Sequence, residues 1–536
     1  MIPLADLLLF TALGFILVGF ERTGRRLAPT AGLAILLFAA FFPPLLHFGR
    51  VHWLATLVLA LGIALQSARL AARSDSLVRR LQRLALPLAA AVPVLIAGSL
   101  TYQKMSEAAR LSELSETPPE APDVLLIILD TVRASSLSMY GYARPTTPGL
   151  ERLAERSLVF DAAWSTAPWT LPAHASLFTG RYAHELSTDW EVPLDDRDPV
   201  LAERFAERGY RTAGFSANLI YATWESGLER GFHHFEDYPV SLAALASSSL
   251  AMRTVTEPLR RLLGPRTLRI RPSADRVVDR FLRWERGDDR PYFAFLNLMD
   301  AHAPYLPPDE LAAEFGPLRT WAAPSGFTDR RFWSEEEIAA ERAAYDGGIA
   351  FMDDQISRLL QSLEQRGKLD RTLVIVTSDH GEQFGEHGLM DHGNSVYRPL
   401  LHVPLLFHWP QRIAAARVER PVSFRDVAGT IAGAALGDPS GFPGSTLLAG
   451  PDDSAPVSPV VSKANRGIRE PEWVPIMRGD MHSLVDGSLH YIRNGDGVEE
   501  LYDLVTDPQE EVNLALDADR GPDLEEMRRR LAEVSR

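Results

Sequence analysis

The chain has 536 residues, enough for about three domains of roughly 150 residues each. Its formal net charge of −15 argues against the basic surface that nucleic-acid binding requires, so no nucleic-acid partner is expected. The sequence contains no cysteine, which excludes disulfides, thiolate metal sites and cysteine nucleophiles.

Four apolar runs fill the N-terminal region, residues 1–102. Each is close to the roughly 20 residues that a helix needs to cross a bilayer. We interpret them as transmembrane helices at about residues 3–20, 31–49, 52–68 and 84–100. The alternative is a signal peptide followed by buried helices, but the first run lacks a basic n-region and further apolar runs follow it.

Arginines between these runs predict the orientation of the bundle. One group lies between the first and second runs, and another between the third and fourth: Arg22, Arg25 and Arg26, then Arg69, Arg73, Arg79, Arg80 and Arg83. The positive-inside rule makes both loops cytoplasmic. The lipid bilayer is therefore an expected partner, and everything after Tyr102 is expected on the outer face of a bacterial cell membrane.

A polar linker over residues 103–122 leads into a region of alternating strand and helix patterns. Val124 to Leu129 form a continuous apolar run, typical of a strand buried on both faces of a parallel sheet. Similar runs occupy residues 292–296, 372–377 and 403–407, and helical patterns lie between them, as at 199–207 and 345–365. This alternation predicts an α/β domain over residues 123–454 with a mostly parallel sheet flanked by helices. Residues 455–536 predict a small α+β subdomain.

Metal-binding side chains follow two of the predicted strands. Asp130 ends the first, and Asp379 with His380 ends the strand at 372–377. Ligands of open α/β sheets bind at the carboxyl ends of strands, so these groups can meet at one divalent ion. Carboxylate and imidazole together favour manganese or zinc, with calcium and magnesium as alternatives. An Asp-His pair can also be incidental, and Asp130 could cap a helix together with Thr131.

Thr170 lies where a loop enters a predicted helix, in the stretch Ala167 to Gly180. A hydroxyl at a helix N-terminus is well placed to meet an anion, because free N–H groups and the helix dipole favour negative charge. Ordinary helix capping by Thr170 is the alternative.

Six segments of the chain, in this order, resemble the sulfatase family of the alkaline phosphatase superfamily. They are LLIILDTVRASSLSMYGY, TTPGLERLAERSLVFDAAWSTAPWTLPAHASLFTG, LAERFAERGYRTAGFSAN, FLNLMDAHAPYLPP, VIVTSDHGEQFGEHG with MDHG, and EELYDLVTDPQEEVNLA. The resemblance covers roughly residues 123–515 and implies the alkaline-phosphatase-like fold.

The resemblance also implies roles for individual residues. Asp130, Asp379 and His380 would bind one divalent metal, and Thr170 would be the nucleophile and touch the metal. The transferred group or the leaving oxygen would contact His302 and His392. His174 stands where the family has an arginine beside its nucleophile, and we expect it to bind substrate.

The nucleophile segment departs from the sulfatase pattern. Thr170-Leu171-Pro172-Ala173-His174 replaces Cys or Ser followed by x-Pro-Ser-Arg, so the formylglycine of that family cannot form. Thr131 replaces the second aspartate of the family's first strand. The remaining set resembles the membrane-bound phosphoglycerol and phosphoethanolamine transferases, in which a metal-bound threonine attacks phosphorus.

We therefore expect a membrane-bound, metal-dependent hydrolase or transferase for phospho- or sulfo-esters, with a lipid head group or glycan as substrate. One alternative is a sulfate-ester hydrolase that works without formylglycine. Another is a non-catalytic membrane protein that keeps the fold. The arginine-rich segment 253–271 is either a solvated helical face or a surface for anionic lipids.

Overall fold

The computed structural model divides the chain into two compact units. The first comprises residues 1–109 and 238–270, and the second comprises residues 110–237 and 271–536. The described residues are 53–72, 105–117, 120–237, 271–317, 333–448, 458–467 and 470–535, with isolated positions within 31–42 and 94–102.

The first unit is described mainly by one helix, α3 (Trp53–Ala72), which overlaps the predicted span at 52–68. Within the described residues, we find no helix whose length and apolar character suffice to cross a membrane. The predicted span at 3–20 and most of those at 31–49 and 84–100 lie outside the described residues.

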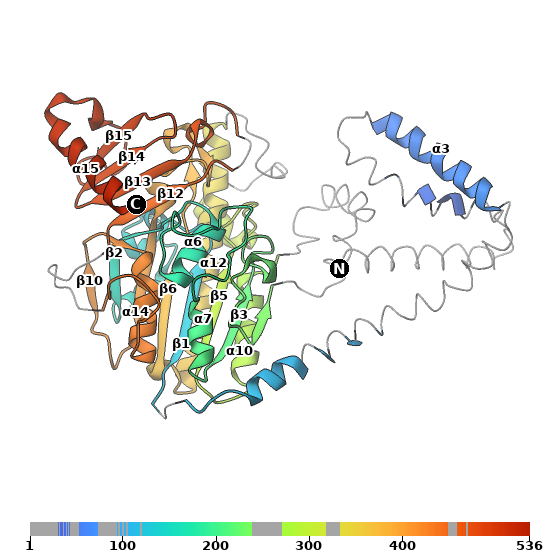
Figure 1. Cartoon of the computed structure of the whole chain (residues 1–536), viewed down its shortest axis with the longest axis horizontal. Coiled ribbons are helices and arrows are strands. Elements are labelled where there is room, and N and C mark those ends of the chain that lie inside the picture. Colours follow the sequence, from blue (N-terminus) through green and yellow to red (C-terminus); the bar gives the residue numbers. More distant parts are fainter. Residues whose placement is uncertain are drawn as a thin grey trace. The chain divides into compact units, whose positions relative to one another are not determined.

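A large mixed sheet forms the centre of the second unit (Figure 1). Its order is β10-β2-β9-β6-β1-β5-β3-β4, and β11 pairs with β2. The strands are β1 (Asp123–Leu129), β2 (Leu158–Trp164), β3 (Arg211–Ser216), β4 (His234–Glu236), β5 (Tyr292–Leu298), β6 (Thr372–Thr377), β9 (His402–His408), β10 (Ala416–Val418) and β11 (Val422–Ser423). The strands predicted from apolar runs are thus confirmed.

Strand β9 is the exception to parallel pairing. It runs antiparallel to both neighbours, β2 and β6, whereas β1, β3, β5 and β6 pair in parallel. The sheet is therefore mostly parallel, as expected, but an apolar run does not encode the direction of its strand.

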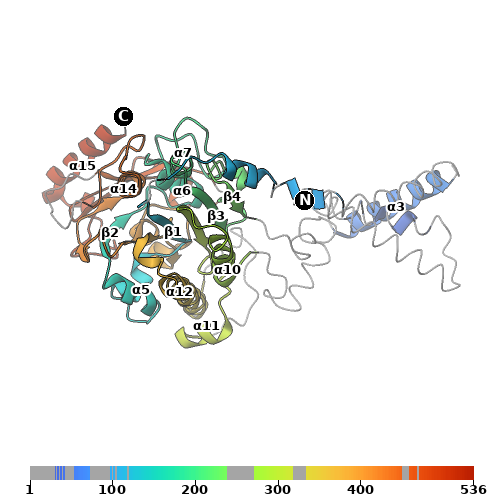
Figure 2. The same ribbon diagram turned by 90° about the horizontal axis from the view of Figure 1, so that it is seen from below.

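Helices cover both faces of this sheet (Figure 2). One face carries α5 (Pro148–Ala154), α10 (Ala274–Glu285) and α12 (Glu335–Gln365). The other face carries α6 (Thr170–Thr179), α7 (Leu201–Glu207) and α14 (Arg425–Leu436). Leu125 and Ile127 of β1 pack toward the first group, and Leu126 and Ile128 toward the second. The strand is apolar throughout because neither face meets water. Helix α12 begins ten residues before the predicted start at 345, with a capping box between Ser334 and Glu337.

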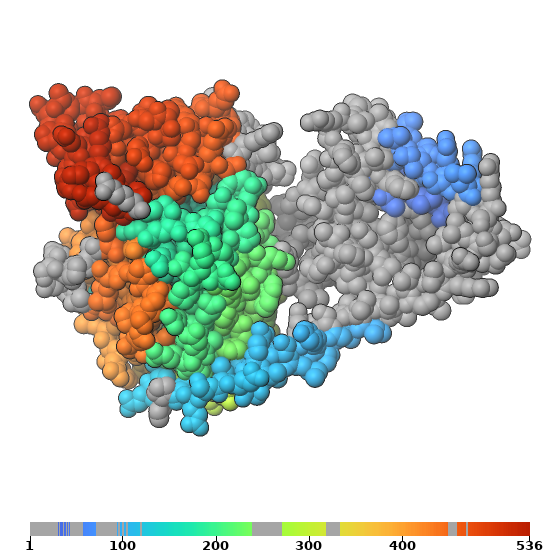
Figure 3. Space-filling model, viewed as in Figure 1, coloured from blue at the N-terminus to red at the C-terminus, as the bar shows by residue number. Residues whose placement is uncertain are grey.

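The C-terminal subdomain is a second, antiparallel sheet. It consists of β12 (Val460–Ala464), β13 (Met481–Asp486), β14 (Leu489–Arg493) and β15 (Glu499–Asp503), followed by α15 (Gly521–Val534). Figure 3 shows it resting on one end of the main domain. It is bonded to the loop before α6, since Ser462 Oγ donates to Ser165 O at 2.6 Å and Lys463 N donates to Thr166 O at 2.9 Å. The small C-terminal sheet expected from the sequence is therefore present and is bonded to the loop before Thr170.

Candidate functional site

The three predicted metal-binding side chains lie together at the carboxyl ends of β1 and β6. One ligand atom each from Asp130, Asp379 and His380 can be chosen so that all lie within 4.8 Å of one another, and all three residues are buried. Strands β1 and β6 are parallel neighbours, so their ends bring these residues together.

Each carboxylate of this cluster has one oxygen occupied by two N–H donors and one oxygen without a hydrogen bond. Asp130 Oδ2 accepts from Asn218 Nδ2 and Asn297 Nδ2, both at 3.0 Å. Asp379 Oδ1 accepts from the backbone nitrogens of Thr131 at 3.1 Å and His380 at 2.9 Å. Asp130 Oδ1 and Asp379 Oδ2 are buried and have no hydrogen-bond partner among the described residues. Orphaned buried oxygens of this kind are free to bind a cation.

Electrostatics supports a cation at this place. Burial, reinforced by the charge of Asp379, raises the pKa of Asp130 well above its usual value. Burial also disfavours the charge on Asp379, but His380, His174 and two backbone N–H groups outweigh it, so the pKa of Asp379 is lowered. Two adjacent buried carboxylates repel each other, and a divalent ion would compensate both. The residues present therefore fit a divalent metal.

Thr170 is the first residue of α6, and its hydroxyl faces the cluster of Asp130, Asp379 and His380. Thr170 Oγ1 lies 3.4 Å from His380 Nε2. His380 Nδ1 lies 3.0 Å from Gly381 O, which favours a proton on Nδ1 and leaves the lone pair of Nε2 directed toward the cluster. The helix is capped by Trp169 without a side-chain bond, so the hydroxyl does not serve as a cap.

His174 lies one helical turn after Thr170 and is fully buried. Its Nδ1 is 2.8 Å from Thr170 O and 3.6 Å from Asp379 Oδ2, and its Nε2 is 3.5 Å from Asn297 Nδ2. Burial lowers its pKa, so the neutral ring is favoured. These contacts are with Thr170, Asp379 and Asn297; its predicted contact with substrate stays a prediction.

His302 and His392 lie beside the cluster, on loops after β5 and β8 (Met390–Asp391). The His392 ring centroid is 4.5 Å from that of His380 and 5.0 Å from that of His302. Burial, with His392 and Arg271 nearby, lowers the pKa of His302 well below its usual value. The structure therefore brings both predicted substrate-binding histidines next to the metal cluster.

Three contributors to this site were missed by sequence reasoning. Glu382 Oε1 lies 2.9 Å from His392 Nδ1, and Asn218 and Asn297 hold Asp130. All three lie within the family-like segments, in DHGE, FSAN and FLNL. Their positions near the carboxyl ends of β3, β5 and β6 place them at the edge of the sheet where the predicted metal ligands lie, but their residue types alone do not indicate these roles.

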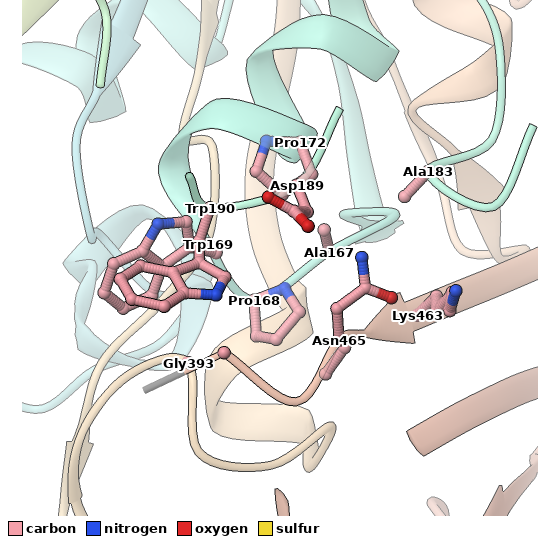
Figure 4. A pocket seen from close by; sticks show the side chains of 12 residues that line it. Ala167, Pro168, Trp169, Pro172, Ala183, Asp189, Trp190, Gly393, Lys463 and Asn465 are labelled. Atoms are coloured by element: carbon pink, nitrogen blue, oxygen red, sulfur yellow. The ribbon is translucent and has the colours of Figure 1, made fainter. Parts of the chain in front are cut away.

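A shallow crevice lies beside the start of α6, between the main domain and β12 (Figure 4). Its lining includes Trp169, Trp190, Lys463 and Asn465. Trp169 separates it from the histidines, with its ring 5.1 Å from His392 and 6.3 Å from Trp190. The crevice therefore adjoins the site through the residue that precedes the nucleophile.

The arginine-rich segment 253–271 lies outside the described residues except for its last member. Arg271 donates to His302 O at 3.2 Å and to Ala303 O at 3.3 Å. This arginine therefore fixes the loop that carries His302.

Comparisons with known proteins identify the family of this chain. The sequence model of the family described as "Sulfatase" matches residues 122–437. The uncharacterized sulfatase YidJ of Escherichia coli is 25% identical over 426 residues, which cover 73% of this chain and 83% of that protein. The delta 4,5-hexuronate-2-O-sulfatase of Bacteroides thetaiotaomicron is 24% identical over 441 residues, 74% of this chain and 85% of that protein.

A solved structure supports the fold. The phosphonate monoester hydrolase of Agrobacterium radiobacter superimposes with a TM-score of 0.62 at 23% identity, over 77% of this chain and 95% of that one. This likeness concerns the fold and leaves the substrate open.

Proposed function

Since this chain belongs to the sulfatase family and is a sulfatase-like hydrolase, we propose that it cleaves phosphate or sulfate esters by attack of Thr170 beside a bound divalent metal ion. The observation that carries the proposal is the position of the Thr170 hydroxyl at the start of α6, 3.4 Å from His380 Nε2 in the Asp130, Asp379 and His380 cluster. A metal ion bound there would lower the pKa of the hydroxyl and offset negative charge on the ester.

The residues around Thr170 support an ordered group transfer. The threonine oxygen bonds to phosphorus as its proton passes to water, and the bond from phosphorus to the alcohol oxygen breaks as that oxygen takes up a proton from water. His302 and His392 hold the transferred group and the leaving oxygen. Water then attacks the phosphothreonine, which releases phosphate and restores the hydroxyl. An alcohol in place of water would give transfer rather than hydrolysis.

Phosphate esters are favoured over sulfate esters by the chemistry of threonine. A sulfate on formylglycine is released when the hemiacetal collapses, a route that a threonine ester lacks. A phosphothreonine needs no such route, because water can attack its phosphorus.

Sulfate-ester hydrolysis without formylglycine is the second candidate. It is supported by the family and by the hexuronate sulfatase among the relatives. A non-catalytic role is the weakest reading, since the metal cluster and the nucleophile position are both complete.

The crevice beside Trp169 supports a sugar as the alcohol part of the substrate. The half-buried ring of Trp190 offers apolar surface beside the buried Trp169, while Lys463 and Asn465 offer a cation and an amide. Sugars carry both apolar C–H faces and hydroxyls, so this lining suits a glycan ester better than an acyl chain.

We also propose that the first unit anchors the enzyme in the membrane, with the catalytic unit outside the cell. The α3 helix supports this, since it exposes apolar side chains while small residues are buried along its other side. The exposed ones are Val58, Leu59, Leu61, Leu65 and Leu70, and the buried ones are Ala60, Ala64 and Ala68. Apolar outer faces and small contact residues are typical of helices packed in lipid.

The test of the catalytic proposal is activity of the full-length protein loaded with manganese, zinc or calcium. Aryl phosphate, phosphodiester and aryl sulfate substrates are compared for each metal. We expect phosphate or phosphodiester turnover that Thr170→Ala abolishes. A matched control is Thr179→Ala on the same helix, whose hydroxyl donates to Ala175 O at 2.7 Å and accepts from Arg181 N at 3.3 Å, away from the Asp130, Asp379 and His380 cluster. Turnover unchanged in Thr170→Ala would end the proposed mechanism, and turnover of sulfate far above phosphate would favour the second candidate.

A further inference from the structure

The carboxylate of Asp130 is held through one of its two oxygens by side chains from two other strands. Asn218 follows β3, and Asn297 lies within β5, which pairs with both β1 and β3. Both amide nitrogens donate to Oδ2 at 3.0 Å, and both asparagines are buried. Oδ1 is buried and has no hydrogen-bond partner among the described residues.

The direction of these hydrogen bonds follows from the chemistry of the groups. Asn218 Oδ1 accepts from the backbone nitrogens of Ile220 at 3.2 Å and Tyr221 at 3.0 Å, so its Nδ2 must face Asp130. An ionised carboxylate only accepts, so Asn297 must also present its Nδ2. Two donors on one oxygen fix the plane of the carboxylate and leave the other oxygen for a cation.

Asp379 is held in the same way, since two backbone N–H groups bond to one of its two carboxylate oxygens. Thr131 N and His380 N donate to its Oδ1, while its Oδ2 has no hydrogen-bond partner in the part of the chain that the structure describes. Thr131, which stands where the resembled family has a second carboxylate, thus holds a neighbouring ligand instead. The cluster offers one open oxygen from each aspartate, His380 Nε2 and the Thr170 hydroxyl.

We propose that Asn218 and Asn297 are positioning residues that make Asp130 a one-oxygen ligand, and that this selects manganese or zinc against calcium. The inference rests on the proposed metal site. Calcium takes six to eight oxygen ligands, often through bidentate carboxylates. Zinc takes about four ligands and accepts imidazole readily, and manganese also accepts mixed oxygen and nitrogen sets. Without the asparagines, Asp130 Oδ2 would also be free to bind the ion. This would disturb the small ligand set that zinc and manganese need, and it would give calcium an additional oxygen ligand.

The test is metal binding by the purified full-length protein after its metal is stripped. Calorimetric titrations with manganese, zinc and calcium give a dissociation constant for each ion, independent of activity. The variants are Asn218→Ala and Asn297→Ala, from different strands, so that misfolding of one leaves the other. Circular dichroism and melting temperature of the apo forms identify variants that remain folded. Asn494→Ala is the matched control, because this buried amide donates to Glu500 Oε1 at 2.6 Å in the C-terminal subdomain.

We expect each asparagine variant to weaken manganese and zinc binding by about 10- to 100-fold, as removal of groups that orient metal ligands commonly does. Calcium binding should change by less than about threefold or become stronger, and Asn494→Ala should bind as the wild type. Wild-type constants in both folded variants would overturn this inference while leaving the proposed function intact. An equal loss for all three ions would overturn the selection of the metal. A wild type that binds none of them would overturn the metal site itself.

Discussion

His392 and Glu382 show how a buried side chain can direct a neighbour that faces the substrate. Glu382 Oε1 lies 2.9 Å from His392 Nδ1, and both residues are almost fully buried. A carboxylate at Nδ1 fixes the ring orientation and the tautomer, so that Nε2 is presented on the opposite side. The His392 ring lies beside the rings of His380 and His302.

Replacement of His392 by alanine should lower kcat/KM by about 100- to 1,000-fold, the range for loss of a hydrogen-bond donor that stabilises charge on the reacting oxygens. Glu382→Gln should cost less, about tenfold, because an amide holds the ring more weakly. Steady-state kinetics on the favoured ester checks both values. His387→Ala serves as the control, since its ring stacks on Tyr397 at 3.7 Å. Full activity in His392→Ala would remove this residue from the site.

At the scale of elements, β12 joins the C-terminal subdomain to the loop before the nucleophile. Trp190 lies against this junction so closely that a Cβ on Gly467 would be 1.6 Å from its Nε1. Gly393 packs against Trp169 in the same way, since a Cβ on Gly393 would be 2.3 Å from Trp169 Cε3. Both indole rings of the crevice are therefore held against glycine backbone.

Trp190→Ala should raise KM for a sugar ester about tenfold and leave kcat within about twofold, because the proposal places the ring against the alcohol part of the substrate and away from the reacting atoms. KM for a small aryl ester should not change. Kinetics with the two substrates side by side measures the difference. Equal effects on both substrates would mean that the ring supports the nucleophile loop instead of the sugar.

The first residue of β9 makes stability depend on pH. Burial lowers the pKa of His402 from 6.5 to about 4. The folded state therefore keeps this histidine neutral, while the unfolded chain takes up a proton below 6.5. The stability that it contributes is complete above pH 6.5 and is lost as the pH falls toward 4, by roughly 3 kcal/mol at most.

His402→Phe should remove this dependence, at the cost of the hydrogen bond from His402 Nε2 to Asp161 O. The difference between the melting temperatures of wild type and variant should shrink or reverse as the pH drops from 7.5 to 4.5. Thermal melts at several pH values measure it. A constant difference over that range would contradict the lowered pKa.

At the scale of the whole molecule, the sequence predicts the sheet better than the site. Strands β1, β5 and β6 are recognisable because residues on both faces are buried, which gives unbroken apolar runs. The antiparallel direction of β9 leaves no trace in its residues. The roles of Asn218 and Asn297 were not predicted, because an asparagine that orients a carboxylate has no sequence signature. Such a role appears only when the ends of three strands come together.

The proposed anchor predicts how the full chain behaves in cells. It should sediment with membranes and resist extraction by salt, and it should enter detergent. Protease added to spheroplasts should cut the catalytic unit while a cytoplasmic marker stays intact. Recovery of the full-length chain in the soluble fraction would contradict the anchor, and protection from protease would contradict the orientation.

The central claim is that Thr170 forms a bond to the transferred group. The most direct measurement is peptide mapping by mass spectrometry after rapid acid quench of the metal-loaded enzyme during turnover. We predict an added phosphoryl group, or a sulfuryl group for the second candidate, on Thr170 in the wild type and none in Thr170→Ala. Sustained turnover without an adduct on Thr170, with the group found elsewhere or nowhere and Thr170→Ala equally active, would contradict the account.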